Sequence, residues 1–281
     1  MSVPTASKPA ESTKAYVTLL TNDAYLPGAI ALLRSLVLTG TQADRVVLYT
    51  EGVSPDRLTQ LESLGARLVN TELLDVSDEF RETHRRDKLH AAAPFTKGRK
   101  PDFHTPLANF CKLRLWQLTE YTDVVFLDAD VIVVRNIDVL FDYPEYSAAP
   151  NVYESLGDFH RLNSGVFSAK PSQETFESML TALDKPGIFW PRTDQTFLQS
   201  YFPDWHGLPV FFNLLQYVWF NLPELWNWES VKVIHYQYEK PWEPDHPRAA
   251  ELRPLIDLWQ AYHDGAPIPD INALPPPGGS G

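Results

Sequence analysis

The stretch from Val124 to Val134 reads VVFLDADVIVV and places two aspartates, Asp128 and Asp130, inside an otherwise apolar run. The four apolar residues before the first aspartate predict a central strand that is buried on both faces of a sheet. Carboxylates are rarely buried without a partner, so the pair needs a physical reason to be there. Ligands of open α/β sheets bind beyond the carboxyl ends of such strands, which is where this pair falls.

The spacing of the two aspartates fits a metal site. Residues two apart on an extended chain point the same way, with roughly 6–7 Å between their Cα atoms. Asp128 and Asp130 could therefore hold one hard divalent cation, and oxygen ligands of this kind suit Mg²⁺, Ca²⁺ or Mn²⁺. The simpler alternative is a pair of capping or turn aspartates at a strand end, because a D-x-D triplet alone is a weak signal.

The same apolar-DxD pattern is also typical of phosphatases of the haloacid dehalogenase type, in which the first aspartate is a nucleophile. Those enzymes usually carry the motif near the N-terminus and need a later apolar strand that ends in an acidic pair. No such pair follows residue 164 in this sequence. The phosphatase interpretation therefore fits poorly, although it is the chief rival on the motif alone.

Strand and helix patterns alternate around this motif. The alternation predicts an α/β fold, a single Rossmann-like domain with a mostly parallel central sheet flanked by helices. Strands are expected at 15–20, 45–50, 67–70, 124–127, 164–169 and 231–236, and helices at 26–37, 54–65, 107–120, 172–184, 194–202 and 248–263.

Composition and charge limit the classes of partner. The chain has 281 residues, enough for one large α/β domain with a sizeable core. Its formal net charge of −12 argues against nonspecific binding to nucleic acid or anionic membrane. Cys111 is the single cysteine, which excludes an internal disulfide and favours a reducing, cytoplasmic location. No stretch approaches the length of a membrane span, and the sequence leaves a homodimer open as an option.

Three segments fall outside the alternating pattern. Residues 1–14 predict a loose polar tail and residues 265–281 a Pro/Gly-rich tail, so the domain is expected to cover 15–264. Within it, residues 75–106 form a charged, Pro-punctuated insert that we predict to be irregular. Such inserts are usually functional loops or disordered. We expect its basic residues mainly to face solvent, with an anion-facing lid or an acceptor loop as the alternative.

Six motifs in order link the chain to a known family. Together they resemble the retaining glycosyltransferases of family 8, the group that contains glycogenin and galactinol synthase. The resemblance covers roughly 15–245, and the KLRLW and NIDVLFD stretches are more similar to galactinol synthase than to glycogenin. The six motifs are TLLTNDAYLPGA (18–29), NFCKLRLW (109–116), FLDADVIVVRNIDVLFD (126–142), LNSGVF (162–167), TDQTFL (193–198) and HYQYEKPW (235–242).

The resemblance implies a GT-A fold, a UDP-linked sugar donor, and Mn²⁺ held by the two DxD aspartates and a later histidine. On this chain the ligands would be Asp128, Asp130 and His235. An O,O,N ligand set agrees with Mn²⁺, which accepts imidazole more readily than Mg²⁺ does, and Mg²⁺ is the alternative ion. The ion would stabilise the departing diphosphate as a Lewis acid. A lone histidine at a strand end is otherwise more often a satisfied structural residue.

The resemblance also implies a donor-binding set. Tyr25 and Asn22 suit a flat base, which needs an aromatic face and amide hydrogen bonds, although TNDAY also reads as an ordinary capped helix start. Lys112 and Lys240 would offset the charge of the diphosphate, with a solvated surface position as the alternative for each. The full set expected to bind the UDP-sugar is Leu19, Thr21, Asn22, Tyr25, Lys112, Asp128, Ala129, Asn163, Ser164, Gly165 and Lys240.

The sugar end of the donor would meet two further motifs. The turn Asn163-Ser164-Gly165 has small residues that would let the donor sugar approach the backbone. Asp194 and Gln195 match the family's acid-Gln pair beneath the anomeric carbon and are the candidate catalytic residues. Retention could proceed through a covalent sugar or by front-face attack, and both routes have an oxocarbenium-like transition state. Asp194 could instead orient donor hydroxyls.

The chain departs from the family pattern in two places. The family's closing motif often reads H-x-x-G-x-x-K-P-W, whereas HYQYEKPW is one residue shorter and has Tyr238 instead of a nearby glycine. The loop must therefore take another path past the diphosphate. Glycogenin glucosylates its own tyrosine, and the corresponding residue here is Trp219, which has no hydroxyl. Self-priming there is not expected, although Tyr217 lies close by in the sequence.

The resemblance, together with these residues, implies a metal-dependent retaining glycosyltransferase. It would move a hexose, glucose or galactose before others, from a UDP-sugar to a hydroxyl and leave an α-linkage. The acceptor could be a polyol, a glycan, a lipid or a natural product. The alternatives are a DxD phosphatase and a catalytically inactive nucleotide-sugar or carbohydrate-binding protein; the presence of Asp128, Asp130, Gln195 and His235 argues against the latter.

Overall fold

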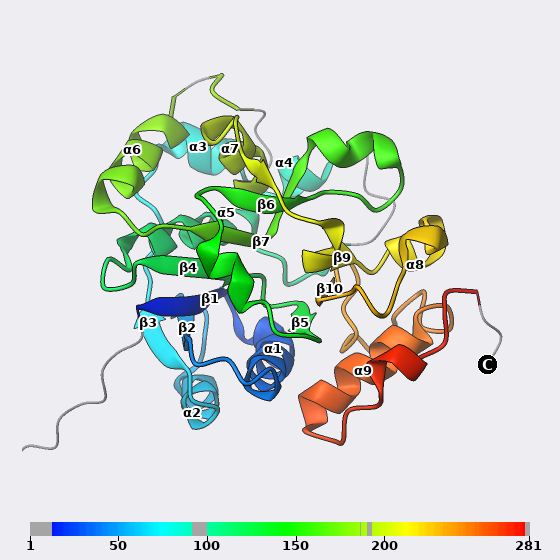
Figure 1. The fold of residues 1–281 in the computed structure, drawn as a ribbon. Helices are drawn as coiled ribbons and strands as arrows, with labels where there is room; N and C mark the ends of the chain where they lie inside the picture. The colour runs from blue at the N-terminus through cyan, green and yellow to red at the C-terminus, as the bar shows by residue number, and fades with distance from the viewer. Residues whose placement is uncertain (1–12, 92–99, 186, 190–192, 279–281) are drawn as a thin grey trace, which may run out of the picture.

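A computed structural model shows how these elements assemble (Figure 1), and it describes residues 13–91, 100–185, 187–189 and 193–278. The strands are β1 Lys14–Leu20, β2 Asp44–Tyr49, β3 Arg67–Asn70, β4 Asp123–Leu127, β5 Val131–Val133, β6 Ser147–Pro150, β7 Leu162–Ala169, β8 His206–Gly207, β9 Leu214–Leu215 and β10 Val233–His235. The α-helices are α1 Leu26–Leu38, α2 Pro55–Ser63, α3 Asp78–Thr83, α4 Arg86–Ala91, α5 Pro106–Asn109, α6 Gln173–Leu183, α7 Asp194–Tyr201, α8 Val218–Asn221 and α9 Arg253–Asp264.

The central sheet has the strand order β3-β2-β1-β4-β7-β6-β8. Strands β3, β2, β1 and β4 run parallel to one another, which confirms the mostly parallel sheet predicted from the alternating pattern. Strand β7 runs antiparallel to β4, and Leu127 pairs with Val166. The Asp128 N–H donates to the Gly165 carbonyl at 2.8 Å just beyond that pair. The first residues of β7 therefore lie beside the end of β4, at one edge of the sheet.

A smaller sheet with the order β5-β10-β9 continues from the two aspartates. Strand β5 follows Asp130 directly and pairs antiparallel with β10, so that His235 lies opposite Val131. The Tyr236 N–H donates to the Asp130 carbonyl at 2.9 Å. This pairing brings the end of β10 against the DxD turn.

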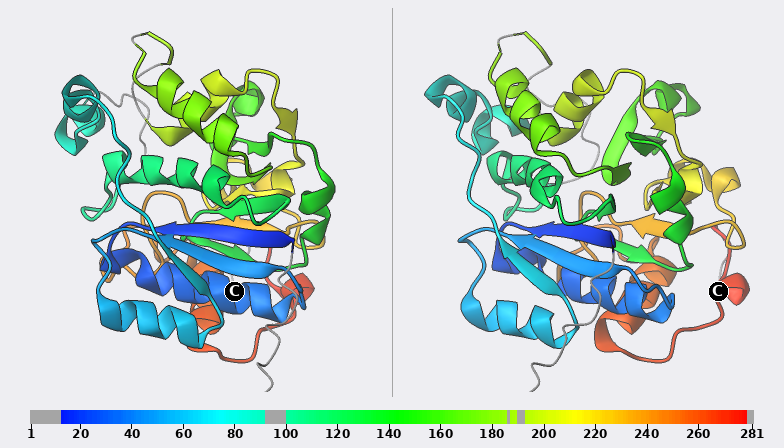
Figure 2. Two further views of the ribbon diagram at one scale, coloured as in Figure 1. Left: turned by 90° about the vertical axis from the view of Figure 1, so that its left-hand side faces the viewer. Right: turned by 60° about the vertical axis from the view of Figure 1, so that its left-hand side comes forward.

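Helices cover both faces of the central sheet, with α1 and α2 on one face and α6, α7 and the 3₁₀ helix over 110–117 on the other (Figure 2). Alternate side chains of β4 point to the two opposite faces of the central sheet. Val124 packs in a cluster with Trp116, and Leu127 packs in a cluster with Leu32. The apolar run before the aspartates is thus buried on both sides, as its composition predicts.

Two predicted helices differ from the observed ones. The helix expected at 107–120 is the short α5 followed by a 3₁₀ helix over Phe110–Gln117. The final helix, expected from 248, begins at Arg253. Proline lacks an N–H and fits only the first turn of a helix, so Pro254 sets that start.

The prediction of an irregular insert at 75–106 is wrong for its first half, which contains α3 and α4. Ser77 caps α3, because its hydroxyl accepts a hydrogen bond from the Phe80 N–H at 3.1 Å. Residues 92–99 of the insert lie outside the described residues.

The two predicted tails differ in how much of each is described. Residues 1–12 of the predicted N-terminal tail lie outside the described part of the chain. In the C-terminal segment, the Trp228 indole N–H donates to the Pro275 carbonyl at 2.9 Å, and a 3₁₀ helix covers Ile271–Ala273. Among the described residues, no helix combines the length and the apolar character that crossing a membrane requires.

Candidate active site

A pocket of about 150 Å³ opens where β1 and β4 end and β7 begins. Its polar lining comes from segments that are distant in the sequence and that the sheet brings together. Two predicted site residues, Asn22 and Gly165, are not among the described residues that line the pocket. The predicted residues that line it are Leu19, Thr21, Tyr25, Lys112, Asp128, Ala129, Asp130, Asn163, Ser164, Asp194, Gln195, His235 and Lys240.

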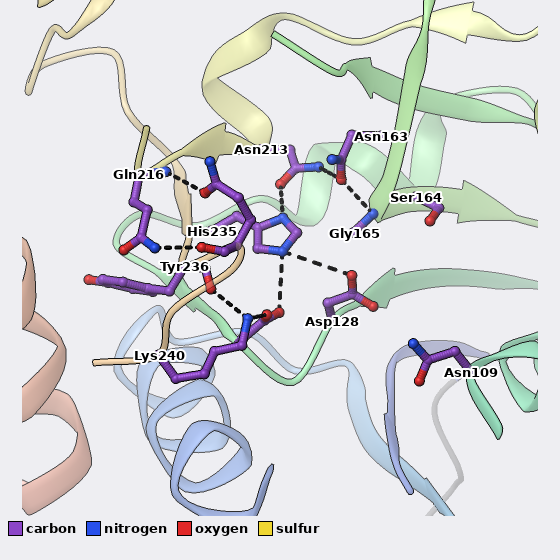
Figure 3. A network of polar contacts seen from close by, with 12 residues as sticks. Asn109, Asp128, Asn163, Ser164, Gly165, Asn213, Gln216, His235, Tyr236 and Lys240 are labelled. Carbon is purple, nitrogen blue, oxygen red and sulfur yellow. Dashed lines mark hydrogen bonds and ion pairs between the residues drawn. The ribbon is translucent and has the colours of Figure 1, made fainter. Parts of the chain in front are cut away.

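Three potential metal ligands converge in this pocket. One ligand atom each from Asp128, Asp130 and His235 lie within 4.8 Å of one another. The Nε2 atom of His235 is 3.3 Å from Asp130 Oδ1 and 3.9 Å from Asp128 Oδ2. Figure 3 shows this ring nitrogen pointing toward Asp128 while the opposite nitrogen points toward Asn213. Two carboxylates and an imidazole at this separation form a ligand set that suits a divalent cation such as Mn²⁺.

Two buried lysines offset the charge of the carboxylates. Lys112 Nζ lies 3.0 Å from Asp128 Oδ1, and the Lys240 ammonium donates to the Asp130 carboxylate. Each lysine is 3% exposed, so the surface-lysine alternative does not hold. Burial alone would raise the pKa of Asp130, but Lys240 and His235 outweigh it and hold that pKa well below its ordinary value. For Asp128, burial raises the pKa more than Lys112 lowers it.

Lys112 also connects the DxD motif to the predicted catalytic pair. Its Nζ donates to Asp194 Oδ2 at 2.8 Å, and the Ser164 hydroxyl donates to the same oxygen at 2.8 Å. The Ser164 N–H donates to Gln195 Oε1 at 3.2 Å. Asp194 and Gln195 begin α7, so the start of this helix and the start of β7 together fix both side chains at the pocket wall.

The polar groups of the segment after β1 cap its own short helix and bind the insert. The Asn22 side-chain oxygen accepts from the Ala24 N–H at 3.1 Å, and its amide nitrogen donates to the Phe103 carbonyl at 3.0 Å. Asn22 therefore caps the 3₁₀ helix over Asp23–Tyr25, as one of its two expected roles predicts. The Tyr25 ring packs edge-on against Phe103, with centroids 4.9 Å apart, and lines the pocket. The Thr105 hydroxyl donates to Thr21 Oγ1 at 2.8 Å.

The insert contributes pocket residues that sequence reasoning missed. Lys100 and His104 both line the pocket, so these two residues depart from the expectation that the insert's basic residues mainly face solvent. The Lys100 ammonium lies 5.1 Å from the centroid of the Tyr238 ring. Burial, and after it the charge of Lys240, lowers the pKa of Lys100 to about 8. The run KGRK before Pro101 was the available signal, but it did not indicate which lysine turns inward.

The shortened closing motif places a tyrosine in an unusual conformation. Tyr238 has φ of +66°, in the left-handed region that favours glycine. It lies three residues after His235, where the family pattern has its glycine. The Tyr238 ring packs against Tyr217, with centroids 5.1 Å apart, and against Tyr153 at 6.1 Å. The Tyr238 side chain is buried, and it lines the pocket.

Trp219 corresponds to the tyrosine that glycogenin glucosylates on itself, and Tyr217 lies close by in the sequence. Neither is an accessible acceptor in this structure. Tyr217 is 1% exposed, and its hydroxyl donates to Glu239 Oε2 at 2.7 Å. Trp219 lies in a cluster of indole rings, with its centroid 5.0 Å from that of Trp226. Neither side chain presents a free hydroxyl to the pocket.

Gly165 lies directly against the imidazole ring of His235. A Cβ at this position would lie 2.4 Å from His235 Cε1, 2.6 Å from His235 Nδ1 and 2.9 Å from Asn163 Oδ1. The absence of a side chain therefore leaves room for the imidazole ring of His235.

We expect Gly165→Ala to displace the His235 ring, because hydrogen-bonding partners on both sides leave it little room to move. Overpacking of this kind costs about 1–3 kcal/mol, and the displaced ring should also weaken Mn²⁺ binding. Thermal unfolding and a Mn²⁺ titration would check this. Gly207→Ala is the control, because a Cβ there meets nothing closer than 3.9 Å. Equal stability and Mn²⁺ affinity in the two variants would contradict the prediction.

Comparison with known proteins bears on both the fold and the family. A model of "Glycosyl transferase family 8" matches residues 16–245. The chain is 31% identical over 239 residues to UDP-glucuronate:xylan alpha-glucuronosyltransferase 2 of Arabidopsis thaliana, covering 82% of this chain and 35% of that protein. It is 35% identical over 238 residues to Glycogenin-1 of Homo sapiens, covering 82% of this chain and 62% of that protein. The chain thus spans only part of the length of these relatives.

A solved structure shows the same fold. The galactosyltransferase LgtC, in complex with donor and acceptor sugar analogs, superposes with a TM-score of 0.59 at 15% identity, covering 91% of this chain and 98% of that chain. The likeness shows the GT-A fold, which confirms the predicted α/β fold class.

Proposed function

The chain belongs to glycosyl transferase family 8, and from this premise we propose that it transfers a hexosyl group from a UDP-sugar to a hydroxyl acceptor, with a divalent cation and with retention of the α-linkage. The observation that carries the proposal is the convergence of Asp128, Asp130 and His235 ligand atoms within 4.8 Å, in a pocket that Asp194 and Gln195 also line. Metal-dependent transfer from a nucleotide sugar needs a cation site beside a sugar site, and this pocket has candidates for both.

The cation would be held by Asp128, Asp130 and His235, with Mn²⁺ favoured over Mg²⁺ because one ligand is an imidazole. Bound there, the ion would supply Lewis-acid stabilisation of the leaving diphosphate. Lys112 and Lys240 would balance the remaining negative charge, since each already lies within ion-pair distance of one of the two aspartates.

The rest of the pocket divides between nucleoside and sugar. Leu19 and Tyr25 line the end formed by β1 and would contact the base and ribose, whereas Ser164, Asp194 and Gln195 line the end formed by β7 and α7. Two hydrogen bonds fix the Asp194 carboxylate. A carboxylate fixed in this way would orient donor hydroxyls or stabilise the positive charge that develops at the anomeric carbon.

Membership of family 8 favours glycosyl transfer over the phosphatase alternative. The inactive-binder alternative is disfavoured because the candidate ligands and Asp194 lie together in one pocket. The acceptor class, whether polyol, glycan, lipid or natural product, is a prediction, as are the cytoplasmic location and the option of a homodimer.

A UDP-release screen tests the proposed function. UDP-glucose, UDP-galactose and UDP-glucuronate would each be incubated with the protein, with Mn²⁺ or with a chelator; UDP-glucuronate is included because the Arabidopsis relative is named for it. We expect slow hydrolysis of one donor with Mn²⁺ and none with chelator. Metal-independent release, no release from any donor, or hydrolysis of a simple phosphate ester instead would contradict the proposal.

Lys100 should make UDP binding depend on pH. A diphosphate favours the charged lysine, and a group with a pKa of about 8 loses its charge as the pH rises from 7 to 9. The UDP affinity should therefore fall by up to about tenfold over that range. Arginine stays charged throughout, so Lys100→Arg should flatten the profile. Isothermal titration of UDP at several pH values would check this, and identical pH profiles for the two proteins would contradict it.

A further inference from the structure

Asn213 lies behind His235 in a chain of buried amide hydrogen bonds (Figure 3). The Nδ1 atom of His235 is 2.9 Å from Asn213 Oδ1, and the Asn213 amide nitrogen donates to Asn163 Oδ1 at 2.8 Å. The Gly165 N–H donates to the same Asn163 oxygen at 2.8 Å, and the Asn163 amide nitrogen donates to Asn151 Oδ1 at 2.8 Å. Asn213 itself is 0% exposed.

The direction of every hydrogen bond in this chain follows from one backbone group. A backbone N–H can only donate, so the Gly165 N–H requires the oxygen end of the Asn163 amide to face it. The Asn213 amide must then turn its nitrogen toward that oxygen, which leaves its own oxygen facing His235. Because an amide oxygen can only accept, Nδ1 of His235 carries a proton.

A proton on Nδ1 determines what the other ring nitrogen can do. In the neutral ring it leaves a lone pair on Nε2, which is the atom that faces Asp130 at 3.3 Å and Asp128 at 3.9 Å. A metal-bound imidazole needs this lone pair, and its second nitrogen usually donates to an oxygen that fixes the tautomer and the ring orientation.

We propose that Asn213 is a positioning residue that holds His235 in the Nδ1–H tautomer and orients Nε2 toward a divalent cation. The inference rests on the proposed function only in that the cation is the one proposed there. It also gives Asn163 a second role, because both ends of its amide serve this chain of hydrogen bonds in addition to lining the pocket.

Two variants separate positioning from simple packing. Asn213→Leu removes the oxygen that accepts from Nδ1–H, and loss of such an outer-shell partner typically weakens metal binding roughly 10–100-fold. Asn213→Asp keeps an accepting oxygen but loses the donor to Asn163, so it should lose stability while retaining most of the Mn²⁺ affinity. Mn²⁺ affinity would be measured by electron paramagnetic resonance of the free ion, without and with UDP, and stability by thermal unfolding.

Ser35→Ala is the matched control. The buried Ser35 hydroxyl accepts from the Val133 N–H at 3.0 Å and donates to the Leu32 carbonyl at 2.7 Å, and Ser35 does not line the pocket. It should lower stability without changing Mn²⁺ affinity. Unchanged Mn²⁺ affinity in Asn213→Leu, or equal losses in the Leu and Asp variants, would overturn the positioning role. If the unmodified protein binds no Mn²⁺ at all, the proposed function fails first, so the two failures are distinguishable.

Discussion

Asp130→Asn is expected to abolish Mn²⁺-dependent binding of UDP. The substitution keeps the size of the side chain but removes the charge that Lys240 and His235 hold in the ionised form. Asp130 is a candidate direct ligand, so the loss should exceed the roughly 10–100-fold that follows removal of an outer-shell partner. The backbone carbonyl of Asp130, which accepts from the Tyr236 N–H, is unaffected, so the pairing of the small sheet should survive.

Isothermal titration of UDP with Mn²⁺ and with chelator measures this effect. Asp138→Asn is the control, because the Asp138 carboxylate accepts hydrogen bonds from the Tyr16 hydroxyl at 2.7 Å and the Thr41 hydroxyl at 2.6 Å, away from the pocket. The control should lose stability and keep its UDP affinity. A Mn²⁺-dependent UDP affinity in Asp130→Asn equal to that of the unmodified protein would reject Asp130 as a ligand.

Lys112→Met should destabilise the fold as well as the site. The buried ammonium lies 3.0 Å from Asp128 and 2.8 Å from Asp194, and its removal leaves two carboxylates facing each other without a cation. Breaking a buried ion pair by removing one partner costs about 3–5 kcal/mol. Mn²⁺ should recover part of this loss, because the ion would again place a positive charge beside Asp128.

The pH dependence of Lys112→Met has a definite sign. Without Lys112, the already raised pKa of Asp128 should rise further, because burial then acts with less opposition. A carboxyl group whose pKa is raised by folding binds its proton more tightly in the folded state, so the variant loses stability as the pH increases. The destabilisation should therefore be smaller at pH 5 than at pH 8. Urea unfolding at both values, with and without Mn²⁺, measures it, and a stability equal to that of the unmodified protein would contradict the prediction.

The sequence correctly predicted those parts of the fold and site that depend on residues close together in the chain. The run VVFLDAD indicated a strand buried on both sides, and the spacing of its aspartates placed both side chains at one sheet edge. The helix predicted at 54–65 corresponds to α2, which has Ser54 as its N-cap residue and Pro55 at its first position. His235 was assigned from the resemblance, because nothing local distinguishes a strand-end histidine that binds metal from one that does not.

The residues that sequence reasoning missed depend on contacts between distant segments. Asn213 and Asn163 are 50 residues apart, and only the folded sheets bring them together behind His235. Lys100 belongs to a basic run in which no periodicity indicates which side chain turns inward. Gly165 was assigned to the sugar-contacting turn, and only the folded structure shows that its close neighbour is the ring of His235.

The most direct test is the anomalous scattering of manganese in crystals soaked with Mn²⁺ and UDP. We expect one strong peak between the carboxylates of Asp128 and Asp130 and the Nε2 atom of His235, with the UDP diphosphate beside it. A pocket that binds UDP without a peak there, while Lys112 and Lys240 still neutralise the two aspartates, would contradict the metal site.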